Sequence, residues 1–331
     1  MQHHIFKALT LAMALFFLLG GGQDAHAARS QQAHKNAVVL AMFGTTVEPA
    51  LKALLAVRQR MEQRFPQTTV RLAFTSNIIR RIWQQRATDP QYRLHHPEVP
   101  EEILSIRGPL ATMALLQDQG FDTLVVQPTH ILPGEEFHDL ANYIKALAGI
   151  ETIKEKYRPF HKVVLGRPAL GASGPRHPYA QDIETAARVL AVDAELARKN
   201  DAALVYMGHG NEHFPTGGIY LEMAARMRAL YPNVLTVIGC VEGYPSFQEV
   251  LRTLRAGSVR RVLLKPFMVV AGNHAMVDMI GPDEDSWQSM LEREGIQVIP
   301  VRQGLGELSG FADIFVEHAA DAAKDAGITL Q

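Results

Sequence analysis

Short runs rich in β-branched residues recur along the chain, and longer stretches of helical character separate them. Parallel strands of one sheet need crossover connections, which are usually helices. This alternation therefore predicts an α/β fold with parallel sheets. The expected strands are Val38–Phe43, Val70–Phe74, Thr123–Gln127, Val163–Leu165, Ala203–Met207, Leu235–Ile238, Arg261–Leu264 and Gln297–Pro300, and the expected helices include Ala50–Arg64, Glu135–Leu147, Ile219–Leu230 and Ser246–Arg255.

The two halves of the chain repeat this pattern in register. A glycine ends the first strand of each half, a proline precedes the second strand, and a glycine opens the helix after the third strand. Matching turn residues predict an internal duplication, and hence two similar lobes with a cleft between them. Coincidence between two generic strand–helix–strand units is the alternative. The alignment pairs Thr45 with His209, Ser76 with Glu242, and Glu136 with His274.

The expected organisation has three parts. Residues 1–27 form a signal peptide, residues 28–172 form the N-terminal lobe, and residues 173–331 form the C-terminal lobe. The N-terminal lobe carries an insertion around residues 80–108. Because this insertion follows the end of a strand, we expect it near the mouth of the cleft, as a lid or a subunit contact.

Composition narrows the class of partner. Of the 331 residues, 47% are hydrophobic and 20% are charged, so a buried core is expected. The formal net charge of −1 gives no reason to expect nucleic acid as a partner. Cys240 is the single cysteine, so an intrachain disulfide is excluded.

The N-terminus has the pattern of a secretory signal. Lys7 precedes an apolar run from Ala8 to Leu19, and an Ala-His-Ala triplet ending at Ala27 is typical of a cleavage site. The run is shorter than the roughly 20 residues that a membrane-spanning helix needs. We therefore expect export to the periplasm and cleavage near Ala27, without stable membrane insertion. A membrane anchor is the alternative.

Two histidines and one glutamate follow consecutive strands of the second half. His209, Glu242 and His274 all stand where a strand is expected to end. Strand ends of a parallel sheet face one crevice, where such folds bind ligands. Imidazole and carboxylate together suit borderline metals such as Co, Fe, Ni or Zn, so the three side chains predict a metal site with catalytic capacity. Taken singly, each also fits a turn or the start of a helix.

The first half offers a second group of polar residues. Thr45, Ser76 and Glu136 hold the equivalent positions, and Arg80 and Arg81 follow Ser76. The arginines can bind the carboxylates of a substrate, because the planar guanidinium matches carboxylate geometry. A helix cap followed by a solvated basic face is the alternative. We assign the five residues as candidate substrate-binding residues.

These motifs together resemble the CbiK-type sirohydrochlorin cobaltochelatases, which are class II tetrapyrrole chelatases. The resemblance covers the chain from about Asn36 to its end. It implies two Rossmann-like lobes, and Co(II) insertion into sirohydrochlorin on the route to cobalamin, with Fe(II) insertion to give sirohaem as a further option. The segments that carry it are Met-Gly-His-Gly at 207–210, Val-Glu-Gly-Tyr-Pro at 241–245, Val-Ala-Gly-Asn-His-Ala at 270–275, Phe-Thr-Ser at 74–76, Ile-Ile-Arg at 78–80, Gly-Glu-Glu at 134–136, Asp-Ser-Trp at 285–287 and Gly-Leu-Gly-Glu at 304–307.

The resemblance also implies roles and partners. His209, Glu242 and His274 would hold the metal and accept the pyrrole protons, and family members tend to be homo-oligomers. The export signal departs from the usual cytoplasmic member. A periplasmic protein that binds or transports metal or haem without chelatase turnover is therefore the alternative. A b-type haem is compatible with either function, with a histidine such as His95, His96 or His130 as its ligand.

Overall fold

The computed structural model describes residues 34–171 and 176–331, of which those from Asn36 onward form one compact unit. The expected signal peptide, and the expected boundary between the lobes at residues 172–173, lie outside the described residues. No helix in the described ranges is long and apolar enough to cross a membrane.

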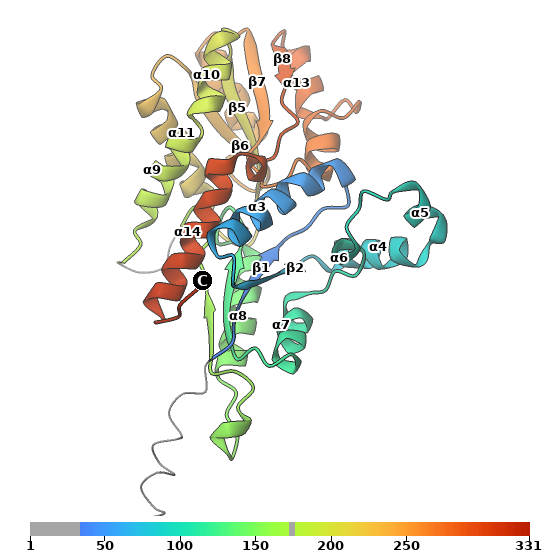
Figure 1. Cartoon of the computed structure of the whole chain (residues 1–331). Coiled ribbons are helices and arrows are strands. Elements are labelled where there is room, and N and C mark those ends of the chain that lie inside the picture. The colour runs from blue at the N-terminus through green and yellow to red at the C-terminus, as the bar shows by residue number, and fades with distance from the viewer. Residues whose placement is uncertain (1–33, 172–175) are drawn as a thin grey trace, which may run out of the picture. The chain divides into compact units, whose positions relative to one another are not determined.

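Two four-stranded parallel sheets organise this unit (Figure 1). The first has the order β2 (Thr69–Phe74), β1 (Asn36–Met42), β3 (Thr123–Pro128) and β4 (Lys162–Leu165). The second has the order β6 (Thr236–Glu242), β5 (Ala203–Gly210), β7 (Arg261–Pro266) and β8 (Gln297–Pro300). The predicted α/β class with parallel sheets is confirmed. Because each strand of the second sheet holds the place of its first-half counterpart, the topology also agrees with the inferred duplication.

The central strands form because their side chains are apolar on both faces. All six residues of β3 are buried, and β1 is buried from its second residue onward. Parallel sheets read as continuous hydrophobic runs because helices cover both of their faces. The helical elements are η1 (Glu48–Ala50), α3 (Leu51–Arg64), α4 (Asn77–Thr88), α5 (Pro90–His95), α6 (Glu101–Leu104), α7 (Pro109–Asp118), α8 (Glu135–Ala148), η2 (Glu155–Tyr157), α9 (Tyr179–Val189), α10 (Ala191–Lys199), α11 (Gly217–Leu230), α12 (Phe247–Ala256), η3 (Ala275–Met279, a π-helical turn), α13 (Trp287–Arg293), η4 (Leu305–Glu307) and α14 (Ser309–Asp325).

The C-terminal helix α14 returns to the first half of the molecule. It packs against α3 and β3, and Phe311 and Phe315 on its inner face are fully buried. Its Asp313 carboxylate accepts two hydrogen bonds from the Arg60 guanidinium of α3, at 2.6 and 2.7 Å. The last helix of the second half therefore completes the core of the first.

The insertion forms α4, α5 and α6 and is anchored on the loop after β1. The indole Nε1 of the buried Trp83 donates to the Thr45 carbonyl at 2.8 Å. Arg86 donates to the next carbonyl, that of Thr46, also at 2.8 Å, and its guanidinium lies over the ring of Trp83. The insertion thus fixes a loop that lies at the carboxyl end of the first sheet.

Candidate active site

A cavity of about 550 Å³ is lined by residues from both halves of the chain. Its walls are largely apolar, and no lysine or arginine lines it among the described residues. The polar groups come mainly from loops at the carboxyl ends of strands, as expected for a ligand site in such a fold. The apolar wall includes Phe43, Leu54, Ile78, Ile79, Ile82, Phe267 and Val270, and the polar wall includes Thr45, Ser76, Glu136, His209, Asn211, Asn273 and His274.

His209 lies at the carboxyl end of strand β5 and lines the cavity. The next residue, Gly210, pairs with Glu242 on β6 and has a φ of +83°. A methyl group added to Gly210 would lie 1.7 Å from the Glu242 carbonyl oxygen. Only glycine therefore allows the two strands to approach this closely, and that approach brings the His209 and Glu242 side chains to the same edge.

The three predicted metal ligands do converge. The His209 Nδ1 and the nearer Glu242 carboxylate oxygen are 3.8 Å apart. The His209 and His274 ring centroids are 4.9 Å apart, with the planes at 85°. All three side chains are about a third to two-fifths exposed, so an ion has access to them. Their ligand atoms do not all lie within 4.8 Å of one another, so shared binding of one ion requires side-chain rotation.

Both imidazoles are held through the same nitrogen. The His209 Nδ1 lies 3.1 Å from the Gly210 carbonyl oxygen, and the His274 Nδ1 lies 2.5 Å from an Asp278 carboxylate oxygen. A partner at Nδ1 sets the tautomer and leaves the Nε2 lone pair for a metal or a proton. Asp278 is a site residue that the sequence motifs did not predict. Its i+4 spacing from His274 on a helical segment was the available signal, and the segment is the π-helical turn η3, a feature frequent at functional sites.

The first-half residues Thr45, Ser76 and Glu136 all line the cavity. Thr45 is buried and accepts a hydrogen bond from the Val47 backbone N–H at 3.1 Å. Ser76 caps α4 by accepting from the Ile79 backbone N–H at 3.4 Å. Glu136, in the first turn of α8, supplies a carboxylate to the cavity wall. The equivalent positions of the two halves thus lie around one cavity.

The two arginines are placed differently. Arg80 and Arg81 do not line the cavity. The Arg80 guanidinium donates to the carbonyls of Phe74 and Thr75 and to the Asn77 side chain, and burial lowers its pKa. It therefore holds the end of β2 against the start of α4, and binding a substrate carboxylate would require it to exchange these hydrogen bonds. Arg81 is exposed.

The three histidines considered as haem ligands have distinct surroundings. His130 lines the cavity, but both of its ring nitrogens are buried without a hydrogen-bond partner, and burial lowers its pKa to about 4. The His95 Nδ1 lies 2.8 Å from the Gln91 carbonyl oxygen. The His96 Nδ1 lies 2.7 Å from a Glu48 carboxylate oxygen, outside the cavity. Haem ligation by any of them stays a prediction.

The chain is similar to known proteins over most of its length. The family described as cobalt chelatase (CbiK) matches residues 36–324. The chain belongs to the CbiK family. This CbiK-family chain is 33% identical to the sirohydrochlorin cobaltochelatase CbiKC of Nitratidesulfovibrio vulgaris over 295 residues, which is 88% of this chain and 91% of that protein. It is 27% identical to the sirohydrochlorin cobaltochelatase of Salmonella typhimurium over 293 residues, covering 87% and 96% of the two chains.

Solved structures support the fold of this CbiK-family protein. SirB from Bacillus subtilis with Fe3+ aligns with a TM-score of 0.56 at 12% identity, covering 90% of this chain and all of that chain. The sirohydrochlorin chelatase SirB from Bacillus subtilis subspecies spizizenii, in complex with cobalt, aligns with a TM-score of 0.52 at 14% identity, covering 88% and 97%. At these identities the likeness concerns the fold.

Proposed function

We propose that this protein is a sirohydrochlorin cobaltochelatase that inserts Co(II) into the macrocycle. The observation that carries the proposal is the convergence of His209, Glu242 and His274, of which both histidines line the cavity, in a chain of the CbiK family. Two imidazoles and a carboxylate hold Co(II) less firmly than thiolates would, so the ion can leave for a better ligand. A tetrapyrrole with four inward nitrogens is such a ligand.

The apolar walls supply binding for the face of the macrocycle. Phe43, Ile79 and Phe267 line the cavity, while its charged groups are confined to a few positions. We expect the ring to lie against these walls, with its carboxylates directed away from them, because burying an unpaired carboxylate is costly. Binding energy from the walls can then bend the ring and expose the nitrogen lone pairs.

The histidines and Glu242 handle the charge that the reaction moves. Insertion of a divalent ion releases two pyrrole protons. The free Nε2 of His209 accepts one of these protons and the other passes to solvent, while the Gly210 carbonyl at Nδ1 keeps that ring oriented. Glu242, near His209, stabilises the imidazolium that forms. His274, supported by Asp278, presents the second Nε2 to the metal.

An anaerobic absorption assay with sirohydrochlorin and Co(II) tests the proposal. The wild-type protein converts the macrocycle spectrum in a metal-dependent manner, and His209→Ala loses this conversion by at least about 100-fold, the usual range for a general base. Circular dichroism of His209→Ala should match the wild type, because His209 is not part of the core. Tight Co(II) binding with an unchanged macrocycle spectrum would contradict the proposal and favour a metal-binding transport protein.

Metal choice is the second question for the same assay. Imidazole and carboxylate ligands can bind both Fe(II) and Co(II). We therefore propose that Fe(II) is also inserted, giving sirohaem. Initial rates with the two ions at equal free concentration rank them. If Fe(II) gave no conversion, cobalt would be the one of these two ions that the protein inserts.

Three further properties belong to this proposal. We propose that the chain is exported, that the mature protein acts in the periplasm, and that it assembles as a homo-oligomer. Cell fractionation with N-terminal sequencing tests the first two, and light scattering of the purified protein tests the third. A Soret band in protein purified from haem-replete cells would establish haem binding.

A further inference from the structure

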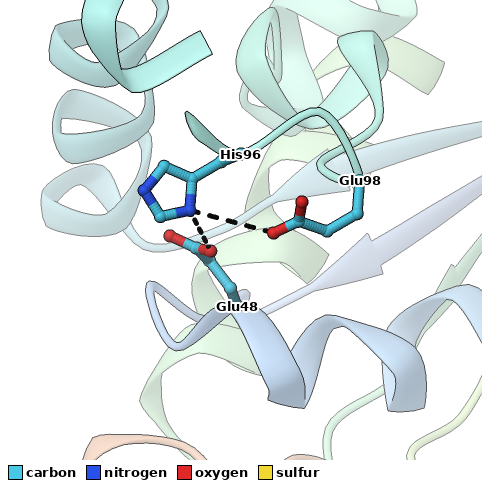
Figure 2. Close-up of side chains that lie close together, drawn as sticks. All are labelled: Glu48, His96 and Glu98. Carbon is cyan, nitrogen blue, oxygen red and sulfur yellow. Dashed lines mark hydrogen bonds and ion pairs between the residues drawn. The ribbon is translucent and has the colours of Figure 1, made fainter. Parts of the chain in front are cut away.

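A second group of potential metal ligands lies outside the cavity. Glu48 belongs to η1, which follows β1, His96 directly follows α5 as its C-cap, and Glu98 lies in the loop between α5 and α6. Figure 2 shows the three side chains directed toward one another. Among the described residues, this is the one group of three or more His, Cys, Asp or Glu side chains whose ligand atoms all lie within 4.8 Å.

The distances suit an ion with short bonds. The His96 Nδ1 lies 2.7 Å from a Glu48 carboxylate oxygen and 3.8 Å from a Glu98 carboxylate oxygen. Donor atoms that share an ion at bond lengths of about 2.0–2.2 Å lie roughly 3 to 3.5 Å apart. The observed distances lie on both sides of this range. An ion can thus replace the proton between Nδ1 and Glu48 with sub-ångström movements.

The charge of the group favours a dication. Within the described ranges, the only ionic partner of Glu48 and of Glu98 is His96. The nearby Arg86 is engaged elsewhere, since it donates to the Thr46 carbonyl and lies over the rings of Trp83 and Tyr92. Two carboxylates therefore share one imidazole. A divalent ion would neutralise both and leave the imidazole neutral, which is the form that binds metals.

A fourth residue holds the ligands in place. The Tyr92 hydroxyl donates to the second Glu48 oxygen at 2.6 Å, so that the first oxygen is free to turn to an ion. The Tyr92 ring also stacks on the His96 ring, with centroids 4.3 Å apart and planes at 19°. Such outer contacts orient ligands before the ion arrives and are a regular part of metal sites.

We propose that Glu48, His96 and Glu98 form a resident site for a borderline divalent cation, of the class of Zn(II) or Co(II), separate from the site of the substrate metal. One imidazole and two carboxylates fit this class better than Ca²⁺, which prefers oxygen alone. The ion would tie the loop after α5 to η1. The adjoining residues Thr45 and Thr46 line the cavity, so it would stiffen the cavity wall.

Zn(II) and Co(II) titrations by calorimetry test the site in a His209→Ala, His274→Ala background, which lacks the two imidazoles proposed to hold the substrate metal. We expect one equivalent of each ion to remain bound. Adding His96→Ala or Glu98→Gln should weaken this binding by at least about 100-fold, and adding Tyr92→Phe by about tenfold. Adding His95→Ala is the matched control. It removes a neighbouring histidine outside the group, so binding should be unchanged.

Thermal unfolding gives a second readout that does not depend on activity. A bound ion stabilises the folded state, so Zn(II) should raise the Tm of the background protein and of its His95→Ala form. It should leave the Tm of the Glu98→Gln form unchanged. Because Glu98 is two-thirds exposed, this variant should fold normally. Absence of ion binding by the background protein would overturn the proposal, as would binding that survives both His96→Ala and Glu98→Gln. Neither result depends on whether the protein turns over sirohydrochlorin.

Discussion

The two sheets have the same strand order but carry different side chains at equivalent strand ends. Where the second sheet presents His209 and Glu242, the first presents Thr45 and Ser76, which are engaged with backbone N–H groups. All but Glu242 line the same cavity. A repeated scaffold can therefore place candidate metal ligands at the strand ends of one half and hydroxyl groups at the equivalent strand ends of the other. The site is decided by side chains at a few positions, and the backbone plan is shared.

The same contrast extends into the core. Gln127 on β3 and Lys265 on β7 both directly precede the proline that ends the strand, and both are fully buried. Gln127 donates to two backbone carbonyls, whereas the Lys265 ammonium group pairs with Asp193 at 2.7 and 2.9 Å. The Asp193 carboxylate also accepts from the Tyr206 hydroxyl at 2.6 Å. One half thus buries a neutral amide where the other buries an ion pair.

The largest expected difference between the halves concerns the two carboxylates of the cavity region. Glu242→Gln should lower kcat by about 100-fold or more, because it removes a charge that is used while protons and metal move. Glu136→Gln, the first-half control, should mainly raise KM and leave kcat within about tenfold, as expected for loss of a binding contact. Steady-state rates of Co(II) insertion check both. Equal losses of kcat would contradict the division of roles.

Because one half buries an ion pair, a substitution there should lower the free energy of unfolding more than the equivalent substitution in the other half. Lys265→Met leaves the Asp193 carboxylate buried without its partner, which should cost about 3–5 kcal/mol of unfolding free energy. Gln127→Met removes two neutral hydrogen bonds and should cost about 1–3 kcal/mol. Urea unfolding followed by circular dichroism measures both. The double variant Lys265→Met, Asp193→Asn should recover part of the loss, and a double variant as unstable as the single one would argue against charge burial as the cause.

Asp278, whose carboxylate contacts the His274 imidazole, has no equivalent in the alignment of the two halves. Asp278→Asn should lower Co(II) affinity at the cavity, or the rate of insertion, by about 10- to 100-fold, as for other carboxylates that orient a metal-binding histidine. The exposed Asp283 provides a control outside this contact. Asp283→Asn should leave the affinity and rate unchanged. If Asp278→Asn behaves like Asp283→Asn, the contact does not support the ligand.

The smallest expected effect is the pH dependence of stability that His130 in the cavity wall causes. His130 stands two residues after the proline that ends β3, where the second half has Met268. Burial lowers the His130 pKa to about 4 in the folded protein. The unfolded chain, with an ordinary pKa of about 6.5, therefore binds the proton first, and stability should fall as the pH drops from about 6.5 to about 4.

His130→Met copies the second-half residue and removes this titration. Relative to the wild type, the variant should therefore be stabilised by roughly 1–2 kcal/mol more at pH 5.5 than at pH 8. Urea unfolding at the two pH values provides the comparison. A difference between the two proteins that does not change with pH would show that His130 is not buried in its neutral form.

Local pattern was sufficient for the fold and for the convergence of the three central candidate residues. The eight expected strands are present with changes at their ends, because each is a short run of strand-forming residues, and the central strands are buried on both faces. His209, Glu242 and His274 were placed together because parallel strands end at one edge. Local pattern did not predict the contacts of Arg80, because the residue type does not reveal that its guanidinium donates to nearby backbone carbonyls.

The sequence by itself therefore determined the strand and helix pattern, the repeat of that pattern, and the convergence of three candidate ligands at one sheet edge. The pattern follows from the period of hydrophobic positions, the repeat from matching glycine and proline positions, and the convergence from the common edge at which parallel strands end. Only the tertiary structure decided that α14 completes the first half, that Asp278 holds His274, and that Glu48 meets His96 and Glu98. Such contacts depend on side-chain direction, or on the approach of segments far apart in the chain, and hydrophobic periodicity specifies neither.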